Sequence, residues 1–302
     1  MNSLTNGNFD GVHLGHRSLI ERARALAPDG RVVAVTFEPH PAAALEARRA
    51  PRRLTPAPLR RSLLESLGGD EVIELEPTAE LLALDGVEFI EFLRGSQSFD
   101  TVVEGADFRF GRGRSCGIGD LKAIGDRLGF EVEVVDDVSV ALEDRTLLDV
   151  RSTAIRWLLT QGRVVDAAIA LGRPHQLTGT VVRGDQRGRD LGFPTANLAP
   201  SETLLPADGV YAGVATLPDG ARVLAAISVG TKPTFGPNQR VCEAHLIDHE
   251  APLDDYDWTI RLEFTRFLHQ QFAYAGVEPL IDRIQRDCDD ARLHAPRGLL
   301  AR

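Results

Sequence analysis

The spacing of short apolar segments changes part-way along this 302-residue chain, and this change constrains the fold more than any other feature. Up to about residue 170, short β-branched runs such as residues 31–37 alternate with longer segments, such as residues 58–67, in which leucines recur at helical spacing. Strands separated by helices of this length join through right-handed crossovers into a parallel sheet, so we predict an α/β domain. Its other expected elements are strands at residues 71–75, 101–104 and 131–135 and helices at residues 89–93, 121–128, 153–159 and 164–171.

The helical pattern stops at Gly172-Arg173-Pro174. From there, short β-like segments follow one another, spaced by Gly, Pro and Asn rather than by helices. This spacing predicts a small antiparallel barrel or sandwich. A last helix is expected at residues 277–291, and we predict two domains, residues 1–172 and 173–302. The expected strands of the second domain cover residues 179–183, 209–216, 223–229, 242–247 and 259–264.

The composition excludes several classes of protein. With 34 Lys and Arg against 44 Asp and Glu, the net charge is −10, which disfavours a protein that coats nucleic acid. A local cationic pocket is still compatible with an anionic small-molecule substrate. Three widely spaced cysteines indicate free thiols in a reducing compartment rather than a disulfide framework or a metal site. Neither a bilayer-spanning apolar run nor a secretory signal is evident, so we predict a soluble cytoplasmic enzyme without nucleic-acid or membrane partners.

A glycine-rich turn that contains two histidines follows the first short strand. Residues 7–16 read G-N-F-D-G-V-H-L-G-H and open a helix. Glycine lets a backbone approach a ligand closely, and a helix N-terminus favours phosphate. His13 and His16 are three residues apart, so we expect them to share one helix face and to donate hydrogen bonds to phosphate oxygens. Two alternatives are surface histidines on a capped helix and a zinc site, although the latter lacks an H-E-x-x-H pattern and an evident third ligand.

This string resembles the N-terminal signature of the HxGH nucleotidylyltransferases. Three later segments, T-F-E-P-H-P at 36–41, G-A-D-F-R-F-G at 105–111 and S-T-A-I-R at 152–156, extend the resemblance in order to the prokaryotic bifunctional riboflavin kinase/FAD synthetase family. It implies a Rossmann-like nucleotidylyltransferase domain in which the phosphate of FMN attacks the α-phosphorus of ATP and pyrophosphate leaves. His13, His16 and Arg156, with Mg²⁺, would position and neutralise the phosphates. The other implied nucleotide- and flavin-binding residues are Gly7, Asn8, Phe9, Asp10, Gly15, Asp107, Arg109, Ser152 and Thr153. Taken singly, Asp107 could cap a turn and Arg156 could be a solvated helix charge.

A second motif lies in the β-rich half of the chain. Residues 179–189 combine glycines and arginines, which alone would predict a flexible hairpin, but L-G-F-P-T-A-N-L follows at 191–198. This segment resembles the G-F-P-T-A-N motif of riboflavin kinases, in which Thr and Asn oxygens bind Mg²⁺ with the nucleotide phosphates. The resemblance assigns that role to Thr195 and Asn197, whose hard oxygen donors suit magnesium. The further implied binding residues are Gly179, Arg183, Gly184, Gly188, Arg189 and Pro194.

Glu243 aligns with the catalytic glutamate of that family, which takes the proton of the ribityl 5′-hydroxyl as this oxygen attacks the γ-phosphorus of ATP. Without the surrounding motifs, Glu243 would be read as a surface residue alternating along a strand. Segments 209–212 (G-V-Y-A) and 228–235 (S-V-G-T-K-P-T-F) also match the family.

The chain departs from the family pattern in four places. Arg151 replaces a small residue before Ser152, and residues 255–257 read D-Y-D where L-Y-G is common. Residues 267–271 read F-L-H-Q-Q where an L-R-x-E-like context with an arginine is expected, and Asn6 occupies an apolar position of the first strand. The first of these departures could alter the adenylyl-site loop, and the third could alter flavin binding in the kinase.

The combined prediction is a Rossmann-like α/β domain followed by a small antiparallel β-barrel riboflavin kinase domain with a C-terminal helix. Such an enzyme phosphorylates riboflavin to FMN and adenylylates FMN to FAD, with ATP as co-substrate and Mg²⁺. We expect Arg109, Arg156 and the arginines of residues 183–189 to concentrate positive charge locally. The alternatives are an enzyme that retains one of the two activities and a flavin- or nucleotide-binding regulator without turnover. The sequence assigns no oligomeric state.

Overall fold

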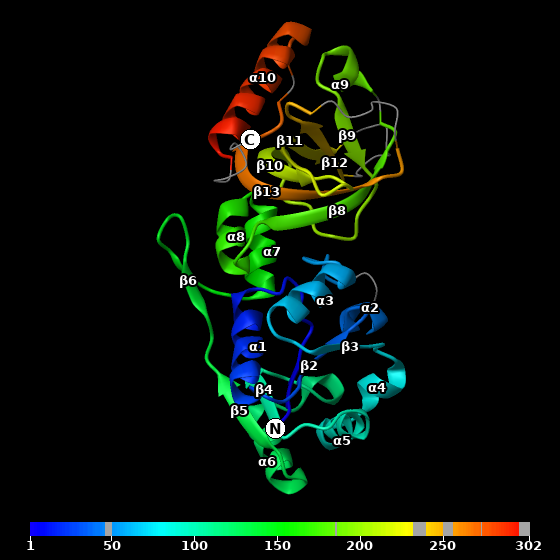
Figure 1. The fold of residues 1–302 in the computed structure, drawn as a ribbon, viewed down its shortest axis with the longest axis vertical. Helices are drawn as coiled ribbons and strands as arrows, with labels where there is room; N and C mark the ends of the chain where they lie inside the picture. Colours follow the sequence, from blue (N-terminus) through cyan, green and yellow to red (C-terminus); the bar gives the residue numbers. More distant parts are fainter. Residues whose placement is uncertain (46–49, 185, 232–239, 250–255, 273, 296–302) are drawn as a thin grey trace. The chain divides into compact units, whose positions relative to one another are not determined.

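The computed structural model describes residues 1–45, 50–184, 186–231, 240–249, 256–272 and 274–295. The chain forms two compact units (Figure 1). The first contains Met1–Val140 and Leu147–Ser152, and the second contains Ala141–Thr146 and Thr153–Arg302. Residues 153–172, which the predicted boundary at residue 172 assigns to the first domain, therefore have most of their contacts within the second unit. A compact unit need not coincide with a catalytic domain, so the boundary stays a prediction. No helix in the described part of the chain is both long and apolar enough to cross a bilayer.

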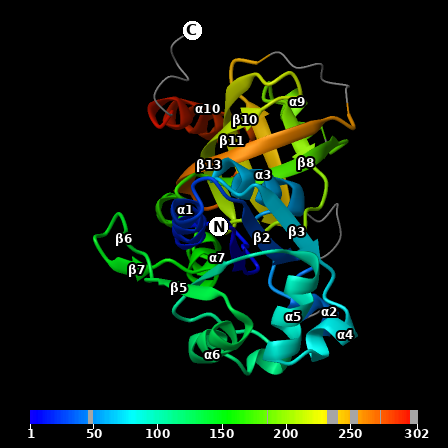
Figure 2. The same ribbon diagram turned by 60° about the horizontal axis from the view of Figure 1, so that its bottom comes forward.

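A five-stranded parallel sheet forms the centre of the first unit, as predicted (Figures 1 and 2). Its order is β3-β2-β1-β4-β5, so the chain moves outward from β1 to β3 and then crosses back to β4. The order reverses between β1 and β4, and ligands of such sheets bind in the crevice beyond the carboxyl ends of the strands at this switch point. The strands are β1 (Ser3–Asn6), β2 (Val32–Phe37), β3 (Glu71–Leu75), β4 (Thr101–Gly105) and β5 (Glu131–Val135).

Helices cover both faces of this sheet, and its inner strands β1, β2 and β4 are accordingly buried on both sides along most of their length. Ile20 of α1 and Leu64 of α3 pack with Ala34 on one face, whereas Leu93 of α5 and Leu121 of α6 pack on the other. The helical elements of this unit are α1 (Leu14–Leu26), α2 (Pro41–Leu45), α3 (Ala57–Ser66), α4 (Ala79–Ala83), α5 (Gly86–Ser96), the 3₁₀ turn η2 (Arg112–Arg114) and α6 (Ile118–Leu128).

Several elements begin earlier than predicted or were not predicted. Helix α5 starts at Gly86 rather than at residue 89, because the Asp85 carboxylate accepts hydrogen bonds from the Val87 and Glu88 N–H groups while Glu88 bonds back to the Asp85 N–H. Helices α2 and α4 and the hairpin of β6 (Ser139–Ala141) and β7 (Leu147–Asp149) are too short to show a hydrophobic period.

A closed six-stranded barrel dominates the second unit, which resolves the predicted choice between barrel and sandwich. Its order is β10-β11-β12-β9-β8-β13, and every neighbouring pair is antiparallel. The barrel strands are β8 (His175–Val182), β9 (Thr195–Leu198), β10 (Gly209–Thr216), β11 (Arg222–Thr231), β12 (Arg240–Leu246) and β13 (Thr259–His269). The helices are α7 (Ser152–Thr160), α8 (Val164–Leu171), α9 (Arg187–Asp190) and α10 (Val277–Leu293).

Alternation along the strands separates the inside of the barrel from its outside. Tyr211 and Phe264 are fully buried and meet edge to face, with ring centroids 5.4 Å apart. Ala212 and Val214, with the opposite parity on β10, pack instead against Cys288 and Ala291 of α10, which lies along the barrel wall (Figure 1). Helix α8 ends where predicted, because Gly172 follows it with a left-handed φ of 71°.

Candidate active sites

The turn that follows β1 is compact and strained. Gly11 has a φ of 93°, and the two non-glycine residues Phe9 and Val12 also have positive φ, 46° and 39°. Both side chains are buried, 0% and 3% exposed, in the core beneath α1 and α3. Strained backbone of this kind persists only where surrounding packing fixes it, and it concentrates at functional sites. The core therefore holds this turn at the carboxyl end of β1, beside the switch point of the sheet.

The two histidines lie side by side at the N-terminus of α1. The prediction that they share a helix face is wrong in one respect, because His13 precedes the first turn and caps it, its Nδ1 accepting the His16 N–H at 3.3 Å. The rings stack with centroids 3.6 Å apart and planes 16° apart. A Cβ at Gly15 would lie 3.2 Å from His13 Nδ1, a tight contact that the imidazole would have to relieve by shifting. Two imidazoles therefore meet the N–H groups at the start of a helix, an arrangement that suits phosphate.

Asp10 ties the turn of residues 7–16 to neighbouring segments of the chain. Its carboxylate accepts hydrogen bonds from the backbone N–H groups of Leu54 and Thr55, at 2.9 and 3.1 Å, and is 6% exposed. The Asp10 carbonyl accepts the Ser152 hydroxyl at 2.7 Å, which ties Ser152 to the same turn. Asp10 thus orders backbone in this structure. Thr153 is exposed and Arg156 half-buried on the first turns of α7, in the second unit, and both remain predicted contributors to the site.

The segment T-F-E-P-H-P contributes a residue that was not among the predicted ones. The Asn8 side-chain amide lies 3.3 Å from His40 Nε2, and the Asn8 carbonyl accepts the Thr36 hydroxyl at 3.1 Å. His40 Nδ1 accepts the Ala42 N–H at 3.1 Å, so both ring nitrogens lie within hydrogen-bond distance of neighbouring groups. The sequence showed the motif. The contact of its histidine with Asn8 became apparent only in the structure, where the turn lies beside the segment that follows β2.

Arg60 is another residue that the pattern concealed, because it lies among leucines in the helical segment. Its guanidinium donates to Glu38 at 2.9 Å and approaches the Asn8 carbonyl at 3.4 Å, and its side chain is 5% exposed. Burial opposes the charged form of Glu38, but hydrogen bonds and charges from Arg53 and Arg60 lower the pKa of this carboxyl below its usual value. Glu38, Arg53 and Arg60 therefore form a network of ion pairs beside Asn8.

The loop after β4 holds the predicted residues Asp107 and Arg109. Asp107 is exposed and pairs with Arg151 at 3.0 Å, so the residue that departs from the family pattern reaches a predicted ligand-binding carboxylate. Arg109 folds back over Gly117 at the start of α6, where a Cβ would lie 2.7 Å from its Nη1. Both residues lie at the carboxyl edge of the sheet.

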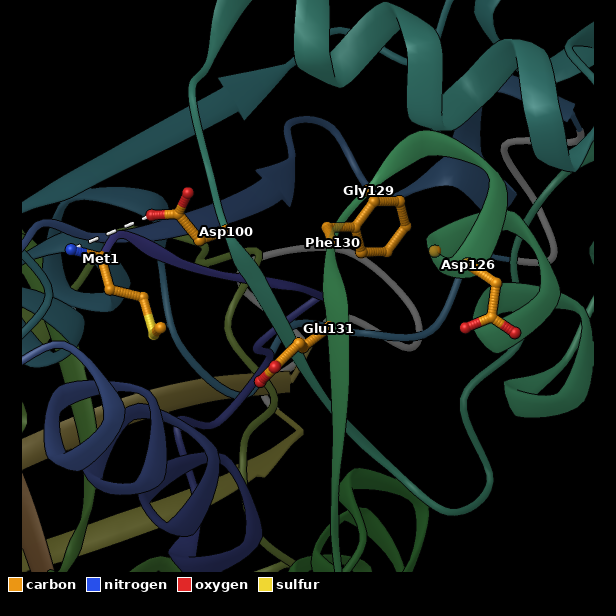
Figure 3. Close-up of a pocket in the computed structure, with 7 residues that line it drawn as sticks. Met1, Asp100, Asp126, Gly129, Phe130 and Glu131 are labelled. Atoms are coloured by element: carbon orange, nitrogen blue, oxygen red, sulfur yellow. Dashed lines mark ion pairs between the residues drawn. The ribbon is translucent and has the colours of Figure 1, made fainter.

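A pocket of about 350 Å³ lies at the amino ends of the strands of this sheet, opposite their carboxyl ends (Figure 3). Met1, Asp100, Asp126, Phe130 and Glu131 line it, and the Met1 amino group pairs with Asp100 at 3.9 Å. Asp100 and Phe130 immediately precede β4 and β5, so this cavity is at the amino ends of the strands. It contains none of the predicted site residues.

The second site is on the outer face of the barrel. The strand register places Asn197 of β9 opposite Glu243 of β12, and Glu243 opposite Ser228 of β11. Thr195 lies opposite His245. Directly opposed residues of antiparallel strands project to the same side, so the register brings the predicted Thr195, Asn197 and Glu243 together. Asn197 is 7% exposed, and its Oδ1 has no hydrogen-bond partner among the described residues, while Nδ2 donates to the Thr195 carbonyl at 3.2 Å.

The glycine-rich loop between β8 and β9 folds back onto these residues. The Phe193 N–H donates to the Gly188 carbonyl at 2.7 Å, and the Pro194 carbonyl lies 2.9 Å from His245 Nδ1. A Cβ on Gly188 would lie 2.4 Å from the Phe193 carbonyl oxygen. Arg183 is exposed and Arg189 half-buried in this loop. Gly179 is placed elsewhere, because it faces Leu198 in the barrel interior, where a Cβ would lie 3.1 Å from that side chain.

Gly184 packs against the Asn197 amide, and a Cβ at this position would lie 2.4 Å from it. Because the resemblance assigns Asn197 to the kinase reaction, we expect Gly184→Ala to displace this residue and to lower kcat/KM for FMN formation about 100-fold, since a misplacement of about 1 Å near reacting groups can cost that much. The control is Gly276→Ala, where the nearest atom to a Cβ is 3.9 Å away and φ is −178°. Steady-state kinetics with riboflavin and ATP measure both, and equal rates for the two variants would refute the role of Gly184.

Two departures from the family pattern now have structural explanations. Asp255 lies outside the described residues, but Asp257 has a φ of 66°, so it retains the left-handed turn for which glycine is usual. Its N–H donates to the Val181 carbonyl at 2.9 Å. Asp tolerates this backbone conformation better than most residues, which keeps the turn intact.

In the second departure, β13 continues to His269, with two shifts of its register against β10 over residues 264–269. His269 Nε2 lies 2.9 Å from Asp287 of α10, and Arg283 places a guanidinium Nε 3.0 Å from the same ring nitrogen. Gln271 donates to the Ser228 hydroxyl at 2.9 Å. Ser228 is the residue of β11 that pairs with Glu243, so Gln271 lies close to the proposed kinase site. A Cβ on Gly230 would lie 2.1 Å from the Gln271 amide oxygen, so the glycine leaves room for this side chain.

Comparison with known proteins gives a consistent result over nearly the whole chain. The family model for FAD synthetase matches residues 2–146, and the model for riboflavin kinase matches residues 171–294. The bifunctional riboflavin kinase/FMN adenylyltransferase of Listeria monocytogenes is 32% identical over 291 residues, 95% of this chain and 90% of that protein. Its counterpart from Escherichia coli is 33% identical over 94% of this chain and 90% of that protein.

A crystal structure from Streptococcus pneumoniae, titled a macrolide-efflux protein, superposes with a TM-score of 0.85 at 28% identity and covers 96% of this chain and 93% of that one. The fold and the two matching family models define a transferase with a nucleotidyltransferase-type α/β unit and a kinase-type barrel. The chain belongs to the bifunctional riboflavin kinase/FMN adenylyltransferase family. It phosphorylates riboflavin to FMN and adenylylates FMN to FAD, using ATP in both steps. Matches to both family models set aside a single-activity enzyme and a regulator without turnover.

Proposed function

We propose that the two reactions take place at the two sites described above and that the two catalytic domains divide at residue 172. Adenylyl transfer is assigned to the turn of residues 7–16 with the loops that adjoin it. Phosphorylation of riboflavin is assigned to the outer face of the barrel around Asn197 and Glu243. The single observation that best supports this division is the register that sets Asn197 opposite Glu243, on strands of the barrel rather than of the parallel sheet.

For adenylyl transfer, we assign charge neutralisation to His13 and His16. The FMN phosphate oxygen forms a bond to the α-phosphorus of ATP while the bond to pyrophosphate breaks, so negative charge must be stabilised on the oxygens of the transferring group. The stacked imidazoles and the first N–H groups of α1 offer donors that are already oriented. Arg156 and Arg109 are proposed to add positive charge. Asn8, Phe9, Gly7 and Gly15 would shape the turn.

For the kinase reaction, we assign Glu243 the role of general base. It would accept the proton of the ribityl 5′-hydroxyl as that oxygen forms a bond to the γ-phosphorus of ATP and the bond to ADP breaks. Arg183, Arg189 and the backbone of the loop between β8 and β9 would hold the nucleotide phosphates. Within this loop the Gly188 carbonyl accepts the Phe193 N–H, and the Pro194 carbonyl lies 2.9 Å from His245 Nδ1, beside Thr195, which supports this placement.

We further propose that Thr195 and Asn197 hold Mg²⁺ with the phosphates of ATP. The fit rests on the Asn197 Oδ1 atom, a buried hard oxygen acceptor without a hydrogen-bond partner in the described part of the chain. Bound magnesium would neutralise charge on the transferred phosphate. Among the described residues, no group of three or more His, Cys, Asp or Glu is arranged to hold a metal.

Replacing Asn197 with alanine should weaken the dependence of nucleotide binding on magnesium. In the wild-type enzyme, calorimetry should show ADP binding more tightly with Mg²⁺ than without it. Asn197→Ala should lose at least about 10-fold of that enhancement, or about 1.4 kcal/mol, because it removes one of the few protein ligands proposed for the ion. The matched control is Thr180→Ala, an exposed position of β8. An enhancement equal to wild type in Asn197→Ala would exclude Asn197 as a ligand.

A further inference from the structure

Glu104 is a buried carboxyl that neither reaction uses. It lies near the end of β4, beside the switch point of the parallel sheet, and is 2% exposed. Carboxyl groups are rarely buried to this extent unless they are paired or protonated. The residue beside it is Asn6, the polar residue that occupies an expected apolar position of β1 and that is itself 6% exposed.

The hydrogen bonding of β1 shows what the Glu104 side chain does. The N–H groups of Ser3 and Gly7 donate to β2, to the carbonyls of Arg31 and Val35. The N–H of Asn6 has the opposite parity and therefore points to the β4 side of the strand. It donates to Glu104 Oε1 at 2.6 Å.

The two strands have separated by this point. Pairing of β1 with β2 continues to Asn6, whereas pairing of β1 with β4 stops at Leu4 and Val102. A backbone carbonyl of β4 would normally accept the Asn6 N–H, and the Glu104 side chain replaces it. This side chain therefore spans the gap that opens at the switch point, where the crevice for ligands forms.

Asn6 directly precedes the turn of residues 7–16. Fixing its N–H on Glu104 fixes the backbone from which Asn8 and His13 are presented. We infer that Glu104 is a positioning residue of adenylyl transfer, which accepts the Asn6 N–H through one oxygen and, as the un-ionised acid, offers its proton to the Asn6 side-chain oxygen. The inference depends on the proposed placement of adenylyl transfer at this turn.

Two observations support the un-ionised form. Burial and the nearby negative charge of Asp107 raise the pKa of Glu104 well above its usual value, although the hydrogen bond from the Asn6 N–H acts in the opposite direction. The Asn6 Oδ1 atom is buried and has no donor among the described residues. The bond from the Asn6 N–H holds the Glu104 carboxyl beside Asn6, where the protonated acid would supply the donor that this oxygen lacks.

The test compares two substitutions in the full chain. Glu104→Gln offers the same acceptor and donor as the neutral acid, so kcat for FAD formation from FMN and ATP should stay within about threefold of wild type. Glu104→Leu removes both, and we expect kcat to fall at least about 10-fold with a smaller change in KM, because the reacting groups are misplaced rather than lost. In hydrogen exchange, the Asn6 amide should stay protected in the Gln variant and exchange at least about 10-fold faster in the Leu variant.

FMN formation from riboflavin in the same protein is the internal control and should be unchanged. If the Leu variant does not fold, a cycle of Asn6→Ala, Glu104→Ala and the double variant measures the side-chain coupling instead, since each single change removes one partner. Equal rates in the Gln and Leu variants, high or low, would overturn the inference, as would additive effects in the cycle. Failure of the proposed site itself would instead appear as normal FAD formation in the His13 variants described below.

Discussion

Replacing Glu243 with glutamine should abolish the formation of FMN from riboflavin while FAD formation from supplied FMN continues. Glutamine keeps the size of the side chain and its place opposite Asn197 and Ser228, but it cannot accept the proton of the attacking hydroxyl. Loss of a general base typically costs about 10²–10⁴-fold, so we expect kcat for the kinase reaction to fall by about 10³-fold. Chromatography of flavins after incubation with riboflavin, ATP and Mg²⁺ measures FMN, and a parallel incubation with FMN measures FAD.

The matched control is Glu278→Gln, an exposed glutamate in the first turn of α10, which should leave both rates unchanged. Glu243→Gln should also bind ADP with wild-type affinity, because its role is in the transfer and not in holding the nucleotide. Loss of both activities in Glu243→Gln would contradict two independent sites. An unchanged rate of FMN formation would exclude Glu243 as the base.

Replacing His13 with asparagine should give the opposite phenotype, in which FMN accumulates and FAD does not form. Asn is a favourable N-cap, so it can still accept the His16 N–H that His13 Nδ1 now accepts, while the imidazole that stacks on His16 is lost. Removing one donor that stabilises transition-state charge costs about 10²–10³-fold in kcat, and we expect FAD formation to fall by that factor.

Comparison with His13→Ala separates catalysis from capping. Alanine removes both the ring and the cap, which should cost about 1 kcal/mol of stability, visible as a lower unfolding temperature, whereas His13→Asn should unfold near wild type. If His13→Asn formed FAD at the wild-type rate and only His13→Ala were impaired, the histidine would serve the helix rather than the reaction. FMN formation reports that the barrel is intact in each variant.

The sequence predicted the regular elements well where local signals were strong. Strands β3, β5 and β10 and helix α8 have the bounds that β-branched runs, Gly-Gly punctuation and the Gly172 stop indicate. Prediction failed where an element was too short to show a hydrophobic period or where a single side-chain hydrogen bond set its boundary. Strand β9 coincides with the P-T-A-N motif and has only four residues, and His13 ends the turn as a cap because its Nδ1 finds the His16 N–H.

The sites were predictable only in part. Motifs identified His13, His16, Thr195, Asn197 and Glu243, and the structure brings the two histidines together and the other three together. The supporting contacts depend on tertiary pairing. Asp10 binds the backbone of residues 54–55, and Glu104 takes the place of a strand partner of Asn6. Both contacts depend on how distant segments meet in the fold, and residue spacing along the chain does not predict them.

The most direct test of two reactions at two sites is a mixing experiment with two inactive variants. Glu243→Gln and His13→Asn, each incubated alone with riboflavin, ATP and Mg²⁺, should yield no FAD, the second stopping at FMN. Mixed, they should form FAD after a lag in which free FMN accumulates, because one variant retains an intact kinase site and the other an intact adenylyl site. Absence of FAD in the mixture, when each variant retains its own partial activity, would contradict the assignment of one reaction to each site.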